Sequence, residues 1–286
     1  ITELAILSLV CIIVLVIWES RNEHAILDLS VFKMQNFAPG VILIFTLGIA
    51  LYGSLVLLPI FLQNLLHYSA LQSGLAMSPG GIGTLLMMPL VGFLVGKRDA
   101  RYLIIFGLSM LSLSMFMMAR YNLNIGYWDI VIPRIVMGIG LAFLFVPLAT
   151  VTFSFIPQAH TGAATGLFNL MRNIGGSVGI AMVTTMLARR QQFHQFRLTE
   201  HTTVYDPNFQ NLVKGITSKL VSSGQTYWVA QKQALGIIYG KTVQQAATMS
   251  FIDVFWVLGV TMMLLIPIVF IMKRPPRHSP PVEGAH

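Results

Sequence analysis

Residues 162–187 read GAATGLFNLMRNIGGSVGIAMVTTML, an apolar run with one charged residue, Arg172, near its middle. The run is long enough to cross a membrane as a helix, which takes about 20 residues. A charged side chain at mid-bilayer depth costs about 2.5–3.5 kcal/mol on insertion scales, so such residues almost always face a bundle interior or a water-filled cavity. The run therefore predicts a membrane helix that carries part of a functional site.

The composition of the whole chain also indicates a membrane protein. Apolar residues make up 55% of the 286 residues and charged residues only 10%, whereas soluble domains carry about 25% charged residues. The net charge of +8 does not indicate nucleic-acid binding, because Lys and Arg lie mainly in loops between apolar runs. The single cysteine, Cys11, excludes a disulfide within the chain and a cysteine-based metal cluster.

Seven long apolar runs lack strand-like alternation and predict membrane helices. They cover approximately residues 4–18, 38–62, 74–96, 102–119, 129–155, 163–187 and 247–272. A long loop, 188–246, separates the last two, and within it 207–223 and 227–246 are predicted as polar helical segments. The second segment runs into the last span without a Gly or Pro break. The loop is interpreted either as a solvated cap or as a docking surface for an extracytoplasmic partner.

Lys and Arg are distributed unevenly between the two sides of the predicted bundle. One side carries eight of them, Arg21, Lys33, Lys97, Arg98, Arg101, Lys273, Arg274 and Arg277. The short loops of the other side carry only Arg120. Because positive residues favour the cytoplasmic side, loops 19–37, 97–101 and 156–162 and the C-terminus are predicted to be cytoplasmic. The loop 188–246 is predicted to be extracytoplasmic.

The third predicted span ends in a glycine-rich and basic pattern. Its residues are Gly83, Gly92, Lys97, Asp99 and Arg101. The pattern resembles the loop signature of the major facilitator superfamily, in which eight residues separate two glycines and an acidic-basic turn follows. That resemblance implies a latch between helices during alternating access. Gly96 stands where the family usually has Asp, and Asp99 where it has Gly. The alternative is therefore a basic turn that only marks the cytoplasmic end of the span and has no latch function.

The fifth predicted span carries a second match to the same family. Residues 134–142 read RIVMGIGLA, which resembles the family pattern Arg-x-x-x-Gly-x-Gly-x-Ala, whose arginine is linked to proton coupling. Arg134 is expected roughly 8 Å inside the outer boundary, at 1.5 Å per helical residue. A side chain at that depth can also extend to the interface, so snorkelling is the alternative.

Polar residues accompany Arg172 along the sixth span. Asn169, Asn173 and Ser177 recur every four residues and therefore share one helix face. This face is interpreted as a cavity wall that meets substrate or a coupling acid, or alternatively as a hydrogen-bonded staple between helices.

Asp253 is expected to be the acidic residue inside the last span. An unpaired carboxyl there could take up and release a proton, whereas one paired with Arg172 or Arg134 would stay ionised. The sequence leaves two roles open for Asp253, that of a proton carrier and that of a member of a structural ion pair.

The sequence indicates neither an enzyme nor a cofactor. The seven histidines are dispersed, and Gly236–Thr242 has one residue too few between its glycines for a phosphate-binding loop. We therefore expect no catalytic residue, no metal and no cofactor, with an ion gradient as the energy source.

Taken in order, the chain resembles the second half of a fourteen-span drug:proton antiporter of the EmrB/QacA type. The segments that carry the resemblance are residues 28–37, 56–63, 74–81, 145–148 and 162–179. It implies an all-α integral membrane protein, with residues 1–18 a truncated linker helix between the halves. It also implies that residues 19–272 form the C-terminal six-helix half and 273–286 a cytoplasmic tail. The N-terminal half of the transporter is then missing.

This resemblance implies multidrug efflux of lipophilic compounds by proton antiport across a bacterial inner membrane. Arg172, Asp253 and Arg134 are its candidates for transport and coupling, and Asn169, Asn173 and Ser177 its cavity candidates, as these spans border the central cavity. Partners would include membrane lipid, protons, a lipophilic substrate and, on the EmrB branch, a periplasmic adaptor and an outer-membrane channel. The alternatives are export of a siderophore, sugar or other metabolite, and a non-transporting scaffold. Because such carriers bind between two halves, we expect the 286 residues alone not to transport.

Overall fold

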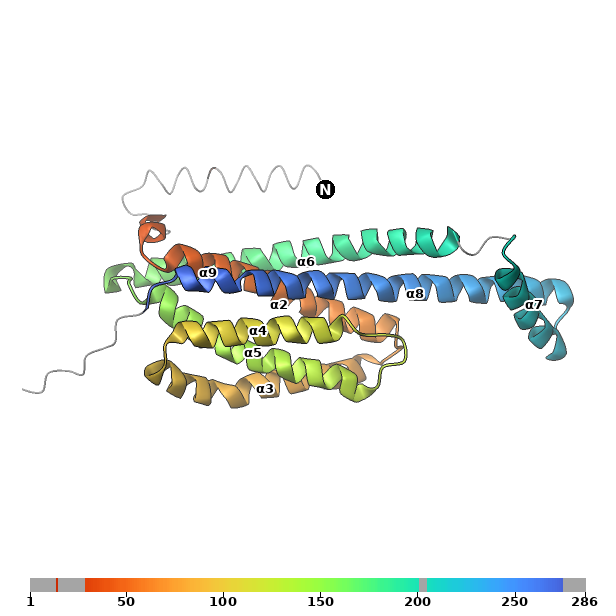
Figure 1. Ribbon diagram of the computed structural model, residues 1–286, viewed down its shortest axis with the longest axis horizontal. Helices are drawn as coiled ribbons and strands as arrows, with labels where there is room; N and C mark the ends of the chain where they lie inside the picture. The colour runs from red at the N-terminus through yellow and green to blue at the C-terminus, as the bar shows by residue number, and fades with distance from the viewer. Residues whose placement is uncertain (1–13, 15–28, 201–204, 275–286) are drawn as a thin grey trace, which may run out of the picture.

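The computed structural model describes residues 29–200 and 205–274, together with Val14, and these form helices connected by short turns. The helices lie side by side in an elongated bundle (Figure 1). The predicted first span, residues 4–18, lies outside the described residues apart from Val14, and so do tail residues 275–286. Within the described ranges there is no strand, which confirms the predicted all-α fold class.

Five segments of the described chain are long and apolar enough to cross a membrane. They are α2 (Phe37–Asn64), α3 (Ala70–Lys97), α4 (Ala100–Met118), α5 (Tyr127–Phe153) and α8 (Tyr227–Leu264) with α9 (Ile266–Ile271). The sixth predicted span lies within α6 (Thr161–Glu200). The polar residues around Arg172 lower its hydropathy, yet α6 packs along α2 and α8 as part of the bundle (Figure 1).

Local signals in the sequence explain where several of these helices begin and end. Ser69 and Gln72 form a reciprocal capping box at the start of α3, with hydrogen bonds of 2.9 and 3.2 Å. Asp206 caps α7 (Pro207–Ser222), whose first residue is proline. Pro267 separates α8 from α9, because its ring nitrogen cannot donate the hydrogen bond that would continue the helix.

Glycines let two pairs of helices approach closely. A Cβ on Gly138 of α5 would collide with the carbonyl oxygen of Gly80 on α3. A Cβ on Gly175 of α6 would likewise collide with the carbonyl oxygen of Phe45 on α2. Thr84 then joins α3 to α5, because its hydroxyl donates to the Gly138 carbonyl at 2.9 Å. Small residues thus set the packing distances within the bundle.

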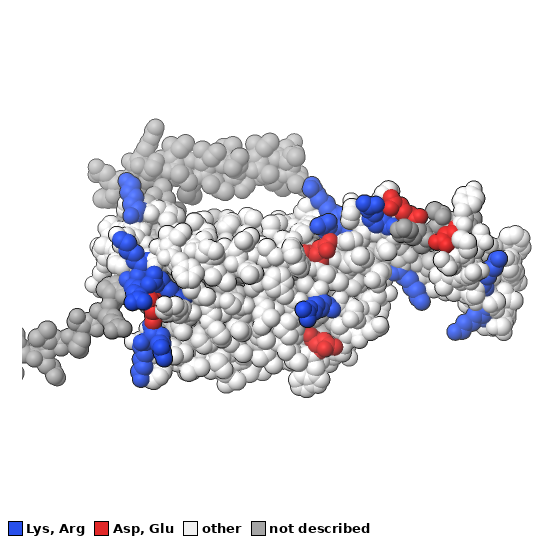
Figure 2. Space-filling model, viewed as in Figure 1, with Lys and Arg blue, Asp and Glu red and all other residues white. Residues whose placement is uncertain are grey.

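Charged residues form two bands that flank an uncharged belt on the face shown in Figure 2. The 19-residue helix α4 gives the thickness of this belt, because Asp99 caps its start and Arg120 follows its end. At 1.5 Å per residue α4 is about 28 Å long, close to the roughly 30 Å of a hydrocarbon core. The belt therefore has the dimensions of a membrane-embedded region.

Two helices continue well beyond the belt. α6 extends to Glu200, and α8 begins at Tyr227, at the tip where α7 packs against it (Figure 1). The predicted helical segments 207–223 and 227–246 are confirmed, as is the continuity of the second with the last span. The helical conformation of residues 188–200 was not predicted. This stretch is polar, but its Arg, Gln and Leu residues favour a helix and it contains no Gly or Pro.

Candidate functional site

Arg172 lies at the middle of the belt, as predicted. It is eleven residues after the first residue of α6, hence about 17 Å along the helix. The side chain is half-buried, and its Nε is buried without a hydrogen-bond partner. No ion pair within 29–200 and 205–274 includes Arg172. The structure therefore leaves a guanidinium at mid-belt depth without an acidic partner in the described part of the chain.

The polar stripe beside Arg172, formed by Asn169, Asn173 and Ser177, makes hydrogen bonds within its own helix. Asn169 Nδ2 donates to the Thr165 carbonyl at 3.0 Å, and Ser177 Oγ donates to the Asn173 carbonyl at 3.2 Å. Asn173 and Ser177 are exposed, and an apolar row of exposed residues follows the stripe: Leu170, Ile174 and Val178. No side chain of the stripe makes a hydrogen bond to another described helix, so a hydrogen-bonded staple between helices is not observed. The stripe and the apolar row form an open amphipathic face.

Arg134 lies inside the bundle and does not reach the interface. It is 7% exposed, and its Nη1 donates to the sulfur of Met137, one turn further along α5, at 3.1 Å. Its Nε is buried without a hydrogen-bond partner, and its backbone packs against Gly80 of α3. The snorkelling alternative is therefore wrong for this structure.

Asp253 pairs with residues that the sequence analysis did not single out. Its Oδ2 lies 2.8 Å from His194 Nε2 and 3.3 Å from Arg190 Nε, both on the extension of α6. The pairing with Arg172 or Arg134, one of the two alternatives left open by the sequence, is not observed. Arg190 and His194 are four residues apart and so share one helix face. This spacing could have indicated a pair of partners for an acid only if residues 188–200, predicted as loop, had been recognised as helical.

The depth of Asp253 also differs from the expectation. It lies 20 residues before Lys273, which is about 30 Å along α8 and α9. Because Lys273 lies at one end of the bundle, this distance puts Asp253 near the opposite boundary of the belt rather than in its middle. The apolar run of the sequence continues past that boundary, which is why the predicted span began too early.

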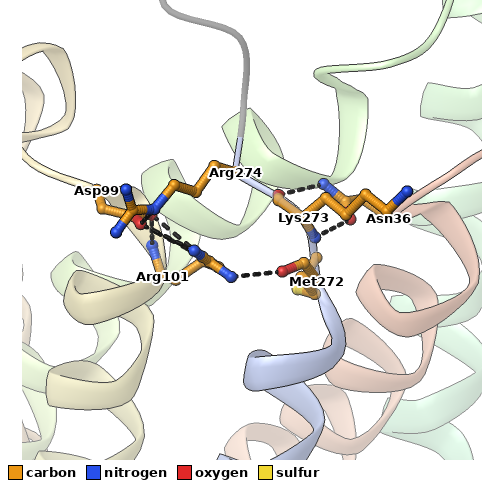
Figure 3. A network of polar contacts seen from close by, with 6 residues as sticks. All are labelled: Asn36, Asp99, Arg101, Met272, Lys273 and Arg274. Atoms are coloured by element: carbon orange, nitrogen blue, oxygen red, sulfur yellow. Dashed lines mark hydrogen bonds and ion pairs between the residues drawn. The ribbon is translucent and has the colours of Figure 1, made fainter.

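A polar network closes the end of the bundle where α9 finishes (Figure 3). Asn36, just before α2, adopts a left-handed conformation with φ 69°, which asparagine tolerates better than most residues. Its Nδ2 donates to the carbonyls of Lys273 at 2.8 Å and Val151 at 3.3 Å, and Lys273 N donates back to its Oδ1 at 2.6 Å. One side chain thus ties together the start of α2 and the ends of α5 and α9.

Asp99 and Arg101, of the predicted gating pattern, form the other part of this network (Figure 3). Asp99 caps α4 by accepting from Arg101 N at 3.2 Å, and it pairs with Arg101 Nη2 at 3.1 Å and Arg274 Nε at 2.7 Å. Arg101 Nη1 donates to the Met272 carbonyl at 2.8 Å. Burial by itself raises the pKa of Asp99, but the hydrogen bonds from Arg101 and the charges of Arg101 and Arg274 bring it below its ordinary value.

The remaining residues of that pattern lie outside the network. Lys97 is exposed, with its Nζ 3.9 Å from the centre of the Phe93 ring. Gly83 packs against the Ile135 carbonyl of α5, whereas a side chain on Gly92 would meet open space. Within the described ranges, no group of three or more His, Cys, Asp or Glu could hold a metal ion.

Comparison with known proteins extends these observations. Residues 4–180 match the Major Facilitator Superfamily model. The chain is 30% identical over 275 residues to the multidrug export protein EmrB of Haemophilus influenzae, covering 95% of this chain and 52% of that protein. It is 31% identical over 284 residues to EmrB of Escherichia coli (strain K12), covering 99% and 54%.

A further relative has a different printed name. The fatty acid resistance protein FarB of Neisseria gonorrhoeae is 33% identical over 280 residues, covering 98% of this chain and 53% of that protein. The chain spans about half the length of the curated relatives it matches. The family match and the helical bundle agree: this chain belongs to the Major Facilitator Superfamily of membrane transporters and is similar to its EmrB-type multidrug export proteins.

Proposed function

We propose that the chain forms the C-terminal half of an exporter that moves lipophilic compounds out of a bacterial cell by proton antiport with alternating access. The observation that carries this proposal is Arg172, a guanidinium at mid-belt depth that has no acidic partner among the described residues and lies beside an open amphipathic face. Charges at that depth mark substrate or ion pathways. The similarity to the EmrB multidrug export proteins supports the same substrate class.

The open face of α6 is suited to a site shared with a second half. Carriers of this kind bind substrate near the bilayer midplane, at the interface between two repeats. The stripe beside Arg172 offers the carbonyl and amide groups of Asn169 and Asn173, while Leu170 and Ile174 offer apolar contact. The other half, or the substrate, then supplies the anionic or hydrogen-bonding partner of Arg172.

The network of Asp99, Arg101 and Arg274 has a mechanical role in this proposal. It joins the α3–α4 turn to the end of α9, and both elements belong to the same half. Holding them together lets the half rock as one body during alternating access. We propose that this end is cytoplasmic, since Lys and Arg gather in the band at this end of the belt (Figure 2).

The projecting helices provide a surface for an extracytoplasmic adaptor. α8 begins 26 residues before Asp253, so it reaches about 39 Å beyond the belt. Near its tip, α7 and α8 enclose a groove of about 710 Å³ whose walls include Phe209, Val213 and Tyr227. We propose that an adaptor protein docks here, as the sequence resemblance implies.

Export measurements on the full-length transporter test this function. In an efflux-deficient strain, Arg172→Ala should lose most export of a fluorescent lipophilic dye, and Arg172→Lys should retain part of it because the positive charge remains. Arg189→Ala is the matched control, because Arg189 is an exposed arginine on the extension of the same helix. Dissipating the proton gradient should stop export by the wild type. Unchanged export by Arg172→Ala would reject the assignment of Arg172 to the transport pathway.

A further inference from the structure

A second cavity lies well away from Arg172, between the end of α2, the extension of α6 and the projecting part of α8. Its volume is about 450 Å³, within the range of small-molecule sites. Leu187, one of its lining residues, is 15 residues past Arg172, about 22 Å along α6. Phe251, another, is two residues from Asp253 at the far boundary of the belt. The cavity is therefore separate from the mid-belt face.

The walls of this cavity combine apolar surface with uncharged polar groups. Ile60, Leu187 and Phe251 give apolar surface, whereas Asn64, Gln191 and Gln244 give amides. None of the residues that line it is Asp, Glu, Lys or Arg. The Gln244 amide is held in place because its Nε2 donates to the Leu65 carbonyl at 3.1 Å. A cavity of this composition suits an uncharged molecule with an apolar body, since an ion would lose its hydration without gaining an opposite charge.

His67 lines the cavity in an unfavourable backbone conformation. Its φ is 57°, in the left-handed region, three residues after α2 ends, where Tyr68 N donates to the Leu62 carbonyl at 3.0 Å. Glycine is the usual residue at such a helix end. The chain therefore tolerates local strain while presenting an imidazole at this cavity, and strain of this kind clusters at ligand sites.

Gly240 keeps the outer edge of the cavity open. It lies inside α8, where glycine is less favourable than other residues, and a Cβ added there would meet no atom within 4 Å. Close helix packing thus does not explain this glycine. A side chain at this position would instead occupy space next to the cavity.

We propose that this cavity is a second binding site, for uncharged lipophilic molecules that carry a hydrogen-bonding group, on the outer side of the exporter. The identification of its occupant with an exported compound rests on the proposed function. The amides and His67 would bind the polar group, and the apolar wall the body of the molecule. A site at this depth would receive the compound after it leaves the face beside Arg172.

Binding of N-phenyl-1-naphthylamine, an uncharged fluorescent lipophile, to the purified full-length transporter tests the proposal. Gly240→Trp should fill the edge of the cavity and weaken binding at least about tenfold, equivalent to about 1.4 kcal/mol. Gly236→Trp is the matched control, because Gly236 lies one turn earlier on α8, a Cβ there also meets no atom within 4 Å, and it does not line the cavity. His67→Gly should weaken binding without destabilising the fold, since glycine suits the backbone at this position.

The outcomes separate this proposal from the proposed function. Equal affinities of the wild type and Gly240→Trp, or equal losses in both tryptophan variants, would overturn the site. Displacement of the probe by a short-chain phospholipid, but not by an exported compound, would overturn the assignment to an exported molecule. Binding that depends on Gly240 in a transporter that exports nothing would support the site and reject the proposed function.

Discussion

Replacing Asp99 separates two contributions that one carboxylate makes to the end of the bundle. Asp99→Ala removes the cap of α4, which costs about 0.5–2 kcal/mol, together with the pairs to Arg101 and Arg274. Arg274 is 68% exposed, and Arg101, at 24%, is also partly open to solvent, so each pair contributes about 0–1 kcal/mol. We expect a total loss of about 0.5–4 kcal/mol. Asp99→Asn keeps a capping oxygen and should lose only the contribution of the two pairs, about 0–2 kcal/mol.

The assay is denaturant unfolding of the purified protein in detergent, followed by circular dichroism. Arg98→Ala is the control, because Arg98 is exposed in the same turn and surface substitutions change stability by at most about 0.5 kcal/mol. Equal losses in Asp99→Asn and Asp99→Ala would refute the separate contribution of the cap. A loss below about 0.5 kcal/mol in Asp99→Ala would refute the role of the whole network.

The pH dependence of the same variants gives a second check. The pKa of Asp99 is lowered in the folded protein, so the carboxylate's contribution is fully present above the unfolded pKa of about 3.9 and is lost as pH falls through the lower folded value. The difference in stability between the wild type and Asp99→Asn should therefore be constant at neutral pH and shrink only in acid below about pH 4. A difference that changes around neutral pH would point to another group.

Two further predictions follow from the contacts between helices. Gly138→Leu should prevent the close approach of α5 to α3, because its Cβ would collide with the Gly80 carbonyl. The free energy of unfolding should fall by about 1–3 kcal/mol or more. A free energy of unfolding within about 0.5 kcal/mol of the wild-type value would contradict this prediction. His194→Ala should leave only the Arg190 pair between the extension of α6 and Asp253 and speed trypsin cleavage after Arg197, on that extension, without changing cleavage near Lys97. Equal cleavage of both sites in the variant and the wild type would show that this contact does not hold the extension.

Hydropathy was sufficient to predict most of the fold. The predicted spans 38–62, 74–96, 102–119 and 129–155 each lie within or overlap closely with α2, α3, α4 and α5. These predictions succeeded because a long helix in lipid must be apolar and must satisfy its own backbone hydrogen bonds. The glycine-rich pattern also led to Asp99 and Arg101, since a basic turn after a span falls at a membrane boundary.

Helix ends beyond the membrane were predicted least well from the sequence. Hydropathy marks the edge of the lipid, whereas a helix ends where local propensity and caps end it. For this reason the extension of α6 through residues 188–200 was missed, and with it the contacts of Arg190 and His194 to Asp253. Such contacts depend on the register of α6 against α8, and no local pattern encodes this register.

The distribution of acids restricts how this half can contribute to antiport. The described acids are Asp99, Asp129, Glu200, Asp206 and Asp253. Asp99 and Asp129 lie at the starts of α4 and α5, and Asp253 is paired near the boundary of the belt opposite Lys273. Glu200 and Asp206 belong to the helices that project beyond the belt. The middle of the described belt thus carries Arg172 without a carboxylate. If the proposed proton antiport holds, the acid that carries the proton at this depth comes from another part of the transporter, and Arg172 acts by pairing with that acid or with the substrate.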